Sequence, residues 1–188
     1  EMCIRDSFNT VSILWSQPIT SLEVLMPDNI WRKVRHEPNA VVLNLGDAMH
    51  FISGGFFKPT IHRVVAPPED QKHYNRLGVF YFALFNENVV LEPLMESDIV
   101  KKASQEHDFW SERHSRGLPA VTASEWERMR VRAYGQGGQK KGSDGHDHEQ
   151  IAGVNVTLYN SIQNVPKVAR KIGGVNEHAR ARVIHATS

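Results

Sequence analysis

The sequence has almost no cysteine, no long apolar run and almost no excess of charge of either sign. Its single cysteine, Cys3, allows no disulfide within the chain and no cysteine-based zinc site, so any metal has to be bound by histidine and carboxylate groups. No apolar segment approaches the roughly 18 residues that a transmembrane helix needs. Residues 1–7 lack the basic start and the apolar stretch of a signal peptide. We therefore expect a cytoplasmic protein without a membrane partner.

The charge balance and the composition favour a folded protein that acts on a small molecule. Lysine and arginine number 22 and aspartate and glutamate 21, which gives a formal net charge of +1 and predicts no nucleic-acid partner. Hydrophobic residues make up 40% of the chain and the mean hydropathy is -0.41, as in globular domains rather than disordered or membrane proteins. A length of 188 residues is enough for one domain with its own core. No obligate protein partner is expected.

The first half of the sequence has the pattern of a β-protein. Short apolar or alternating runs are separated by turn-forming residues, which predicts an all-β sandwich or barrel. Segment 41–45 is almost wholly apolar and is expected to be buried on both faces. Segment 77–84 is the richest in aromatic residues and is expected to form the centre of the core. The glycines of 51–55 predict a bend. The predicted strands are residues 10–15, 22–26, 30–35, 41–45, 60–65 and 77–84.

Beyond residue 93 the pattern changes to helix. Residues 98–113 are compatible with a helix, and Thr122 followed by Glu125 predicts a capped start for a helix that ends near Tyr134. Residues 136–148 are rich in glycine and lysine and are expected to form a flexible loop, in which the His-Asp-His run at 146–148 is solvated rather than metal-binding. Residues 151–159 return to a strand pattern, and the basic tail 161–188 is expected to be weakly structured.

Three stretches stand out together, at residues 42–47, 53–64 and 76–82. The second contains the run Lys-Pro-Thr-Ile-His-Arg-Val with His62, and the third begins with Arg76-Leu-Gly. In order and spacing they resemble the C-terminal part of the catalytic core of iron(II)/2-oxoglutarate-dependent dioxygenases of the isopenicillin N synthase-like family. The resemblance implies a mainly β protein with C-terminal helices, whose strands form part of a double-stranded β-helix, or jelly roll.

The resemblance implies a role for three residues. The family binds iron(II) with two histidines and one carboxylate, which leaves positions open for 2-oxoglutarate and O2. His62 corresponds to the distal histidine ligand of the metal. Arg76 corresponds to the arginine of the family's Arg-x-Ser motif, whose guanidinium binds the far carboxylate of 2-oxoglutarate. Gly78 takes the place of the serine, so one hydroxyl contact to the cosubstrate is lost or replaced. No catalytic residue beyond these metal and cosubstrate ligands is predicted.

The other two metal ligands of the family are missing from the sequence. In the family a His-x-Asp motif precedes the strand that here begins at Thr10, and alignment on Phe8 puts Arg5 at the histidine and Ser7 at the aspartate. Arginine offers no lone pair to a metal and serine is a poor neutral ligand, so His62 alone would bind iron weakly. Either residues 1–7 are a non-native, misassembled segment, which we favour, or the protein is a metal-deficient member of the family.

Two functions agree with these observations. The first is a fragment of a non-haem oxygenase, inactive as written, whose parent uses Fe(II), 2-oxoglutarate and O2 for hydroxylation, desaturation or ring closure of a small organic substrate. Its truncated jelly-roll domain, with a helical extension, is expected to span residues 8–160, followed by the basic tail 161–188. The second is a metal-free jelly-roll protein that binds a small molecule or serves as a scaffold.

Overall fold

The structure is a computed structural model that describes residues 3–5, 9–133, 140–141 and 147–158. Ser7, His146 and the predicted tail 161–188 lie outside the described residues. The order of the elements is β1 (Cys3–Arg5), β2 (Val11–Trp15), β3 (Leu22–Leu25), β4 (Trp31–Lys33), β5 (Val41–Leu45), α1 (Asp47–Ile52), β6 (His62–Val64), β7 (Phe80–Ala83), α2 (Asp98–Ser104), α3 (Ser111–Ser115), α4 (Ala123–Ala133), β8 (Lys140–Lys141), β9 (Asp147–Ile151) and β10 (Val154–Leu158).

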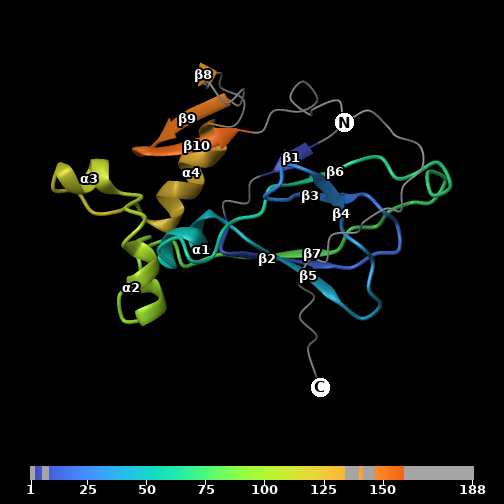
Figure 1. Cartoon of the computed structure of the whole chain (residues 1–188), viewed down its shortest axis with the longest axis horizontal. Coiled ribbons are helices and arrows are strands. Elements are labelled where there is room, and N and C mark those ends of the chain that lie inside the picture. Colours follow the sequence, from blue (N-terminus) through green and yellow to red (C-terminus); the bar gives the residue numbers. More distant parts are fainter. Residues whose placement is uncertain (1–2, 6–8, 134–139, 142–146, 159–188) are drawn as a thin grey trace.

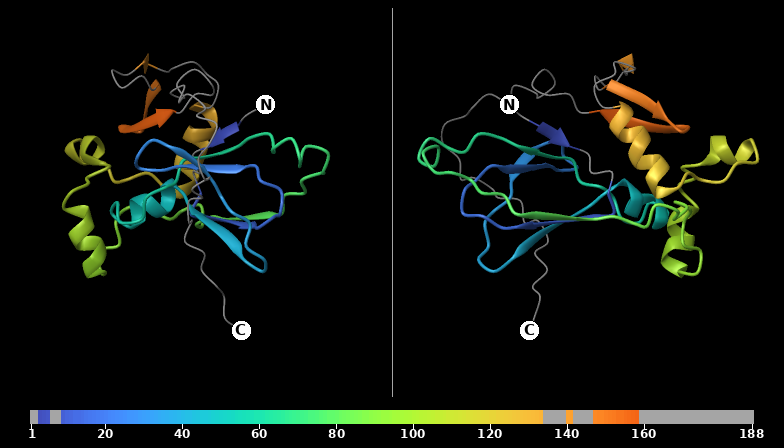
Figure 2. Two further views of the ribbon diagram at one scale, coloured as in Figure 1. Left: turned by 45° about the vertical axis from the view of Figure 1, so that its right-hand side comes forward. Right: turned by 180° about the vertical axis from the view of Figure 1, so that it is seen from behind.

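Two antiparallel sheets form the layers of a partial jelly roll. One has the strand order β1-β6-β3-β4 and the other β5-β2-β7. Figure 1 shows the first sheet above the second, with the helices and β8 to β10 gathered at one end of both, and the two views of Figure 2 agree. The predicted fold class, a mainly β protein with helices in its C-terminal part, is confirmed.

All six predicted strands are present, most of them shorter than predicted, and turn chemistry explains where β3 stops. Asn29 adopts a left-handed conformation with φ 60° and donates its backbone N–H to Met26 O at 2.8 Å. Asp28 accepts the backbone N–H of Ile30 at 3.1 Å. Asn and Asp are favoured at such positions because they tolerate this backbone and bond to it locally. The chain therefore reverses, and β4 pairs with β3 as a hairpin.

The hydrophobic core does not form around the aromatic strand. Phe80, Tyr81 and Phe82 of β7 are 56%, 59% and 47% exposed, so the prediction that 77–84 is the centre of the core is wrong. The prediction that 41–45 is buried on both faces is also wrong, because Leu43 is exposed. The physical reason is position: β7 and β5 are the two edges of a three-stranded sheet, and the described residues leave these side chains uncovered.

The core lies instead at the helical end of the sheets. At its centre, the ring of Phe51 lies 4.9 Å from that of Trp110 and 4.8 Å from that of Trp126, measured between centroids. Such aromatic contacts add to the free energy gained by burial. Trp110 donates its indole N–H to Leu91 O at 2.9 Å, which satisfies the polar atom of a fully buried ring. The buried members are Ala48, Phe51, Ile52, Leu91, Trp110, Ala120, Val121, Trp126, Ile151 and Val156.

Residues 51–55, predicted as a bend, begin inside a helix. α1 runs from Asp47 to Ile52 and turns only afterwards, at Gly54 and Gly55, whose φ angles are +59° and +87°. The bend prediction is therefore right for the glycines and wrong for the two residues before them. α1 forms because three of its apolar side chains, Ala48, Phe51 and Ile52, enter the core. This is a tertiary effect that local glycine content does not show.

The remaining helices are close to those predicted. Residues 98–113 divide into α2 and α3, which are separated by a segment that contains the buried Trp110. α4 begins with the predicted capping arrangement: Glu125 donates its backbone N–H to Thr122 Oγ1 at 3.3 Å, and Glu125 Oε2 accepts the backbone N–H of Thr122 at 2.8 Å. No helix in the described part of the chain is long and apolar enough to span a bilayer.

The predicted strand 151–159 contains the end of β9, a turn and β10, so the prediction is right for 154–158 and wrong for the turn at 152–153. β9 and β10 pair antiparallel around Ala152 and Gly153, which both have positive φ angles of 53° and 86°, as a two-residue hairpin turn requires. His148 lies in β9 and its Nδ1 is 3.2 Å from Thr157 Oγ1 on β10. The flexible-loop prediction is therefore wrong for 140–141 and 147–148, which are strands, and its other residues lie outside the described part.

Candidate functional site

His62 begins β6, which lies between β1 and β3 in the four-stranded sheet. Its Nδ1 is 2.9 Å from Thr60 O. A carbonyl oxygen can only accept, so Nδ1 carries the proton of the neutral ring and donates it, and Nε2 keeps its lone pair. Histidines that bind metals are held in this way, with one ring nitrogen bonded to a backbone carbonyl and the other directed to the metal. The ring is therefore in the tautomer that a metal ligand needs.

The strand register defines the positions next to His62. Arg5 of β1 lies directly opposite it on one side, and Val24 of β3 lies opposite on the other. Neither valine nor arginine is a metal ligand. Within residues 3–5, 9–133, 140–141 and 147–158, no group of three His, Cys, Asp or Glu side chains could hold a metal ion. The described residues therefore do not fit an iron site with three protein ligands.

A pocket lies between the two sheets, at the end of β2. Arg76 reaches it because the chain before β7 runs beside the end of β2, where Trp15 donates its backbone N–H to Val79 O at 3.0 Å. The pocket takes in residues of β2, β3 and β5 and of the segment that follows β4. Its lining consists of Leu14, Trp15, Ser16, Gln17, Ile19, Leu22, Val34, Arg35, His36, Val42 and Arg76.

The electrostatics of this pocket suit an anion. Its lining contains two arginines, Arg35 and Arg76, and no acidic residue. Arg76 Nε is buried and has no hydrogen-bond partner among the described residues. A buried N–H without an acceptor costs free energy, and a carboxylate is the acceptor that a guanidinium binds best, through two parallel hydrogen bonds. The pocket can therefore bind a carboxylate at Arg76.

The position of Gly78 is open. A Cβ built on this glycine would meet only ring carbons of Phe80, at 3.9 Å, which is ordinary van der Waals contact. The glycine is therefore not required by crowding at this position. The structure leaves space where the Arg-x-Ser motif of the family carries its serine side chain.

The predicted site residues lie on two facing sheets. His62 belongs to the four-stranded sheet, whereas Arg76 precedes β7 of the three-stranded sheet. Leu22 connects the two regions, because it lines the pocket of Arg76 and belongs to β3, which pairs with β6. His62 itself does not line that pocket. The roles of His62, Arg76 and Gly78 stay predictions.

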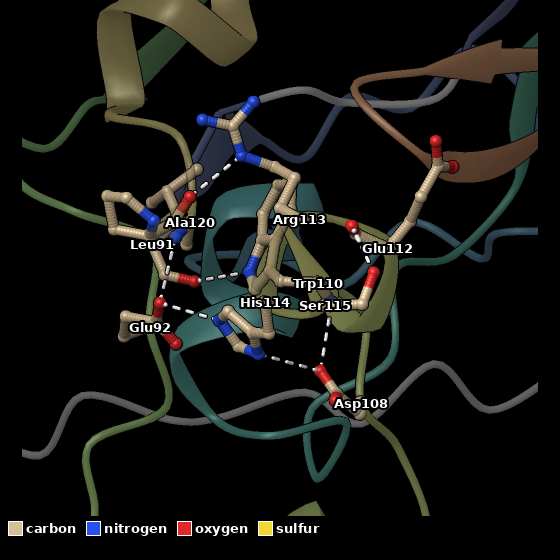
Figure 3. A network of polar contacts seen from close by, with 10 residues as sticks. Leu91, Glu92, Asp108, Trp110, Glu112, Arg113, His114, Ser115 and Ala120 are labelled. Atoms are coloured by element: carbon tan, nitrogen blue, oxygen red, sulfur yellow. Dashed lines mark hydrogen bonds and ion pairs between the residues drawn. The ribbon is translucent and has the colours of Figure 1, made fainter. Parts of the chain in front are cut away.

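A polar network that the sequence did not reveal lies outside this region, around α3 (Figure 3). His114 lies between two carboxylates, with its Nε2 3.1 Å from Glu92 Oε1 and its Nδ1 3.4 Å from Asp108 Oδ1. The hydrogen bond that His114 donates to Glu92, more than any other contact, raises the pKa of His114 above its ordinary value. Glu92 Oε1 also accepts the backbone N–H of Ala120 at 2.8 Å. The network holds α3 against two loops. Sequence patterns did not reveal it, because Glu92 and Asp108 lie 22 and 6 residues before His114 in the chain.

His50 has a structural role. Its Nδ1 is 2.7 Å from Phe57 O, so it donates to that carbonyl, and its ring lies 4.7 Å from that of Phe109. Burial lowers the pKa of His50.

The sequence is similar to known oxygenases. Residues 2–84 match the sequence model of the 2OG-Fe(II) oxygenase superfamily. Jasmonate-induced oxygenase 3 of Arabidopsis thaliana is 33% identical over 84 residues, which cover 45% of this chain and 22% of that protein. A UPF0676 protein of Schizosaccharomyces pombe is 26% identical over 152 residues, which cover 78% of this chain and 42% of that protein. The chain therefore spans less than half the length of these curated relatives.

Solved structures show the same fold. A 2OG-Fe(II) oxygenase family protein of Caulobacter crescentus superimposes with a TM-score of 0.55 at 25% identity, over 71% of this chain and 40% of that chain. A full-length Neurospora crassa protein solved in complex with α-KG gives a TM-score of 0.58 at 22% identity, over 71% of this chain and 37% of that chain. Residues 2–84 and the jelly-roll sheets are therefore similar to the 2OG-Fe(II) oxygenase superfamily, whose members use Fe(II), 2-oxoglutarate and O2.

Proposed function

We propose that this chain forms the 2-oxoglutarate-binding part of an Fe(II)/2-oxoglutarate-dependent oxygenase, in which Arg76 binds the far carboxylate of the cosubstrate. One observation supports this most: Arg76 Nε is buried without a partner among the described residues, in a pocket whose lining has no acidic side chain. Binding of a carboxylate would satisfy this N–H and neutralise the guanidinium. The position of Arg76 in the Arg-x-Ser motif of the family leads to the same assignment.

The residues of the pocket bind and orient the cosubstrate. Arg76 fixes one end of the dicarboxylate, and apolar side chains such as Leu14, Leu22 and Val42 surround its carbon chain. In a complete site, Fe(II) held by His62 and two further ligands would supply the oxidation chemistry, and 2-oxoglutarate would supply two electrons for it.

The metal half of the site is incomplete in the described residues. His62 is the proposed ligand, because its Nε2 lone pair is the one that the hydrogen bond to Thr60 leaves available. The position directly opposite it carries Arg5, which has no lone pair for a metal. We therefore infer that the chain as it stands binds 2-oxoglutarate without completing the oxygenase reaction.

The substrate class is proposed from relatives. The Neurospora crassa protein was also solved in complex with thymine, and a gibberellin 20 oxidase of Arabidopsis thaliana is 32% identical over 94 residues. We propose that the complete protein likewise oxidises a small organic molecule, by hydroxylation, desaturation or ring closure, and does so in the cytoplasm.

The test is the affinity for 2-oxoglutarate, measured by ligand-observed NMR titration on the full chain. We expect Arg76→Ala to weaken binding about tenfold or more, since hydrogen bonds to charged groups are worth that much. Arg76→Lys keeps the charge but not the bidentate geometry and should be intermediate. The control is Arg116→Ala, because this arginine is 67% exposed and paired with Glu112 on α3. Equal affinity of the Arg76→Ala variant and the unmodified chain would overturn the proposal.

A further inference from the structure

The pocket has to replace one contact that the family motif supplies. Family members carry a serine two residues after the arginine, whereas this chain has Gly78, with open space where the side chain would be. A carboxylate oxygen accepts more than one hydrogen bond, and a buried one that accepts fewer loses free energy. Another polar residue of the pocket is therefore needed beside Arg76.

Ser16 is already engaged by two other residues. Its Oγ accepts the backbone N–H of Glu37 at 3.2 Å and lies 2.7 Å from His36 Nδ1. The contact with His36 is donated by the hydroxyl in one tautomer of the ring and accepted by it in the other. Both the hydroxyl of Ser16 and Nδ1 of His36 are thus engaged with each other.

Gln17 is available. Its Oε1 is buried and, among the described residues, has no hydrogen-bond partner, as is true of Arg76 Nε in the same pocket. The two residues come from neighbouring segments, because the hydrogen bond from Trp15 to Val79 aligns the chain after β2 with the chain before β7. Two unsatisfied polar groups that line one pocket indicate a ligand that bonds to both.

We propose that Gln17 is the second residue that binds the far carboxylate of the cosubstrate and takes the place of the missing serine. A half-turn of its terminal amide exchanges the oxygen and the nitrogen, so the same position presents an N–H donor to an anion. The carboxylate would then accept from the guanidinium of Arg76 and from the amide of Gln17. This inference rests on the proposed function and specifies its binding site.

The experiment combines loss and rescue in the full chain, with 2-oxoglutarate affinity measured by ligand-observed NMR. We expect Gln17→Ala to weaken binding about tenfold, and Gly78→Ser in the same chain to restore most of that loss by adding back a hydroxyl. Gly78→Ser is sterically free, because its Cβ meets only the Phe80 ring at 3.9 Å. Gln105→Ala, at the exposed end of α2, is the matched control, and far-UV circular dichroism checks the fold of every variant.

A second ligand separates this contact from a general effect on the pocket. 2-Oxobutyrate lacks the far carboxylate, so its affinity should not change in the Gln17→Ala variant. Equal loss for both ligands, or no loss for 2-oxoglutarate, overturns the role of Gln17. If Arg76→Ala weakens binding and Gln17→Ala does not, only this inference fails. If neither substitution matters, or the unmodified chain does not bind 2-oxoglutarate, the proposed function fails with it.

Discussion

Arg5 and His62 lie directly opposite each other in the antiparallel pair of β1 and β6. Positions opposite in such a pair have Cβ atoms about 5 Å apart and share a face of the sheet, so two histidines there could reach one metal ion. The family alignment puts the first histidine ligand at position 5, and the strand register independently puts position 5 beside the distal histidine. The motif comparison and the strand register therefore lead to the same proposed ligand position, which in this sequence carries arginine.

Restoring the motif should restore metal binding. We expect the double substitution Arg5→His and Ser7→Asp to raise the affinity for Mn(II), a redox-stable substitute for Fe(II), by about a hundredfold or more, because three ligands replace one. Isothermal titration calorimetry measures the affinity. The control adds His62→Ala to the double substitution and should lose the gain. Equal Mn(II) affinity with and without His62 would contradict the assignment of His62 as a metal ligand. If Mn(II) leaves the affinity for 2-oxoglutarate unchanged, the alternative of a metal-free small-molecule-binding protein is favoured.

The ion pair between Asp47 and Arg130 should stabilise the helical end. Asp47 Oδ2 is 3.2 Å from Arg130 Nε, and their side chains are only 13% and 8% exposed. We expect Arg130→Met to lower the free energy of unfolding by about 3 kcal/mol, because it leaves a buried carboxylate without its cation. Urea unfolding followed by tryptophan fluorescence measures the loss. Arg116→Met breaks the exposed pair with Glu112 and should lower the free energy of unfolding by less than about 1 kcal/mol. Equal losses for the two substitutions would show that the burial of the Asp47–Arg130 pair does not add to its contribution.

Gly55 should tolerate no side chain. Its φ is +87°, and a Cβ there would lie 2.4 Å from Cδ2 of His107. Gly117 has a similar φ of +70° but nothing within 4 Å of such a Cβ, so it isolates the cost of the backbone conformation, about 1 kcal/mol. We expect Gly55→Ala to lower the melting temperature clearly more than Gly117→Ala does, because it adds a steric clash. Equal shifts would mean that His107 moves away without cost.

The His114 network should make stability depend on pH. The pKa of His114 is raised from 6.5 in the folded state, first of all by its hydrogen bond to Glu92. A raised pKa means that the protonated ring stabilises the fold, fully below pH 6.5, and that this contribution is lost as the pH rises through the folded-state pKa. His114→Gln should remove the dependence in this window, as measured by urea unfolding at several pH values. The control is His73→Gln in an exposed loop. Because His114 is itself partly exposed, its contribution to the pH dependence of the free energy of unfolding should be small. A pH dependence that is unchanged in the His114→Gln variant would contradict this role of His114.

The sequence predicted the elements more reliably than their environment. The strands 10–15 and 22–26 and the capped start at Thr122 were recognisable because alternation, turn residues and capping pairs are local. The burial of β7 was predicted wrongly, because whether an aromatic strand is covered depends on which element lies across from it. α1 was missed for the same reason, since its apolar side chains are held by Trp110 and Trp126, far away in the chain.

The candidate site was predictable only where a motif carries it. His62 and Arg76 were predicted from the family pattern, but that pattern says nothing about Gln17. Its proposed role depends on the end of β2 and the chain before β7 lying side by side. The pairing of Arg5 with His62 likewise needed the strand register. Contacts between distant segments were thus the information that the sequence alone lacked.

The location of the tightly packed cluster around Phe51, Trp110 and Trp126 has a consequence for cooperativity. Backbone amides of α1 and α4 should exchange with deuterium on the timescale of global unfolding. Those of β5, β2 and β7, none of whose side chains is fully buried, should exchange through smaller openings. Occupation of the pocket that Arg76 lines would then slow exchange in the sheets and leave the helical end unchanged.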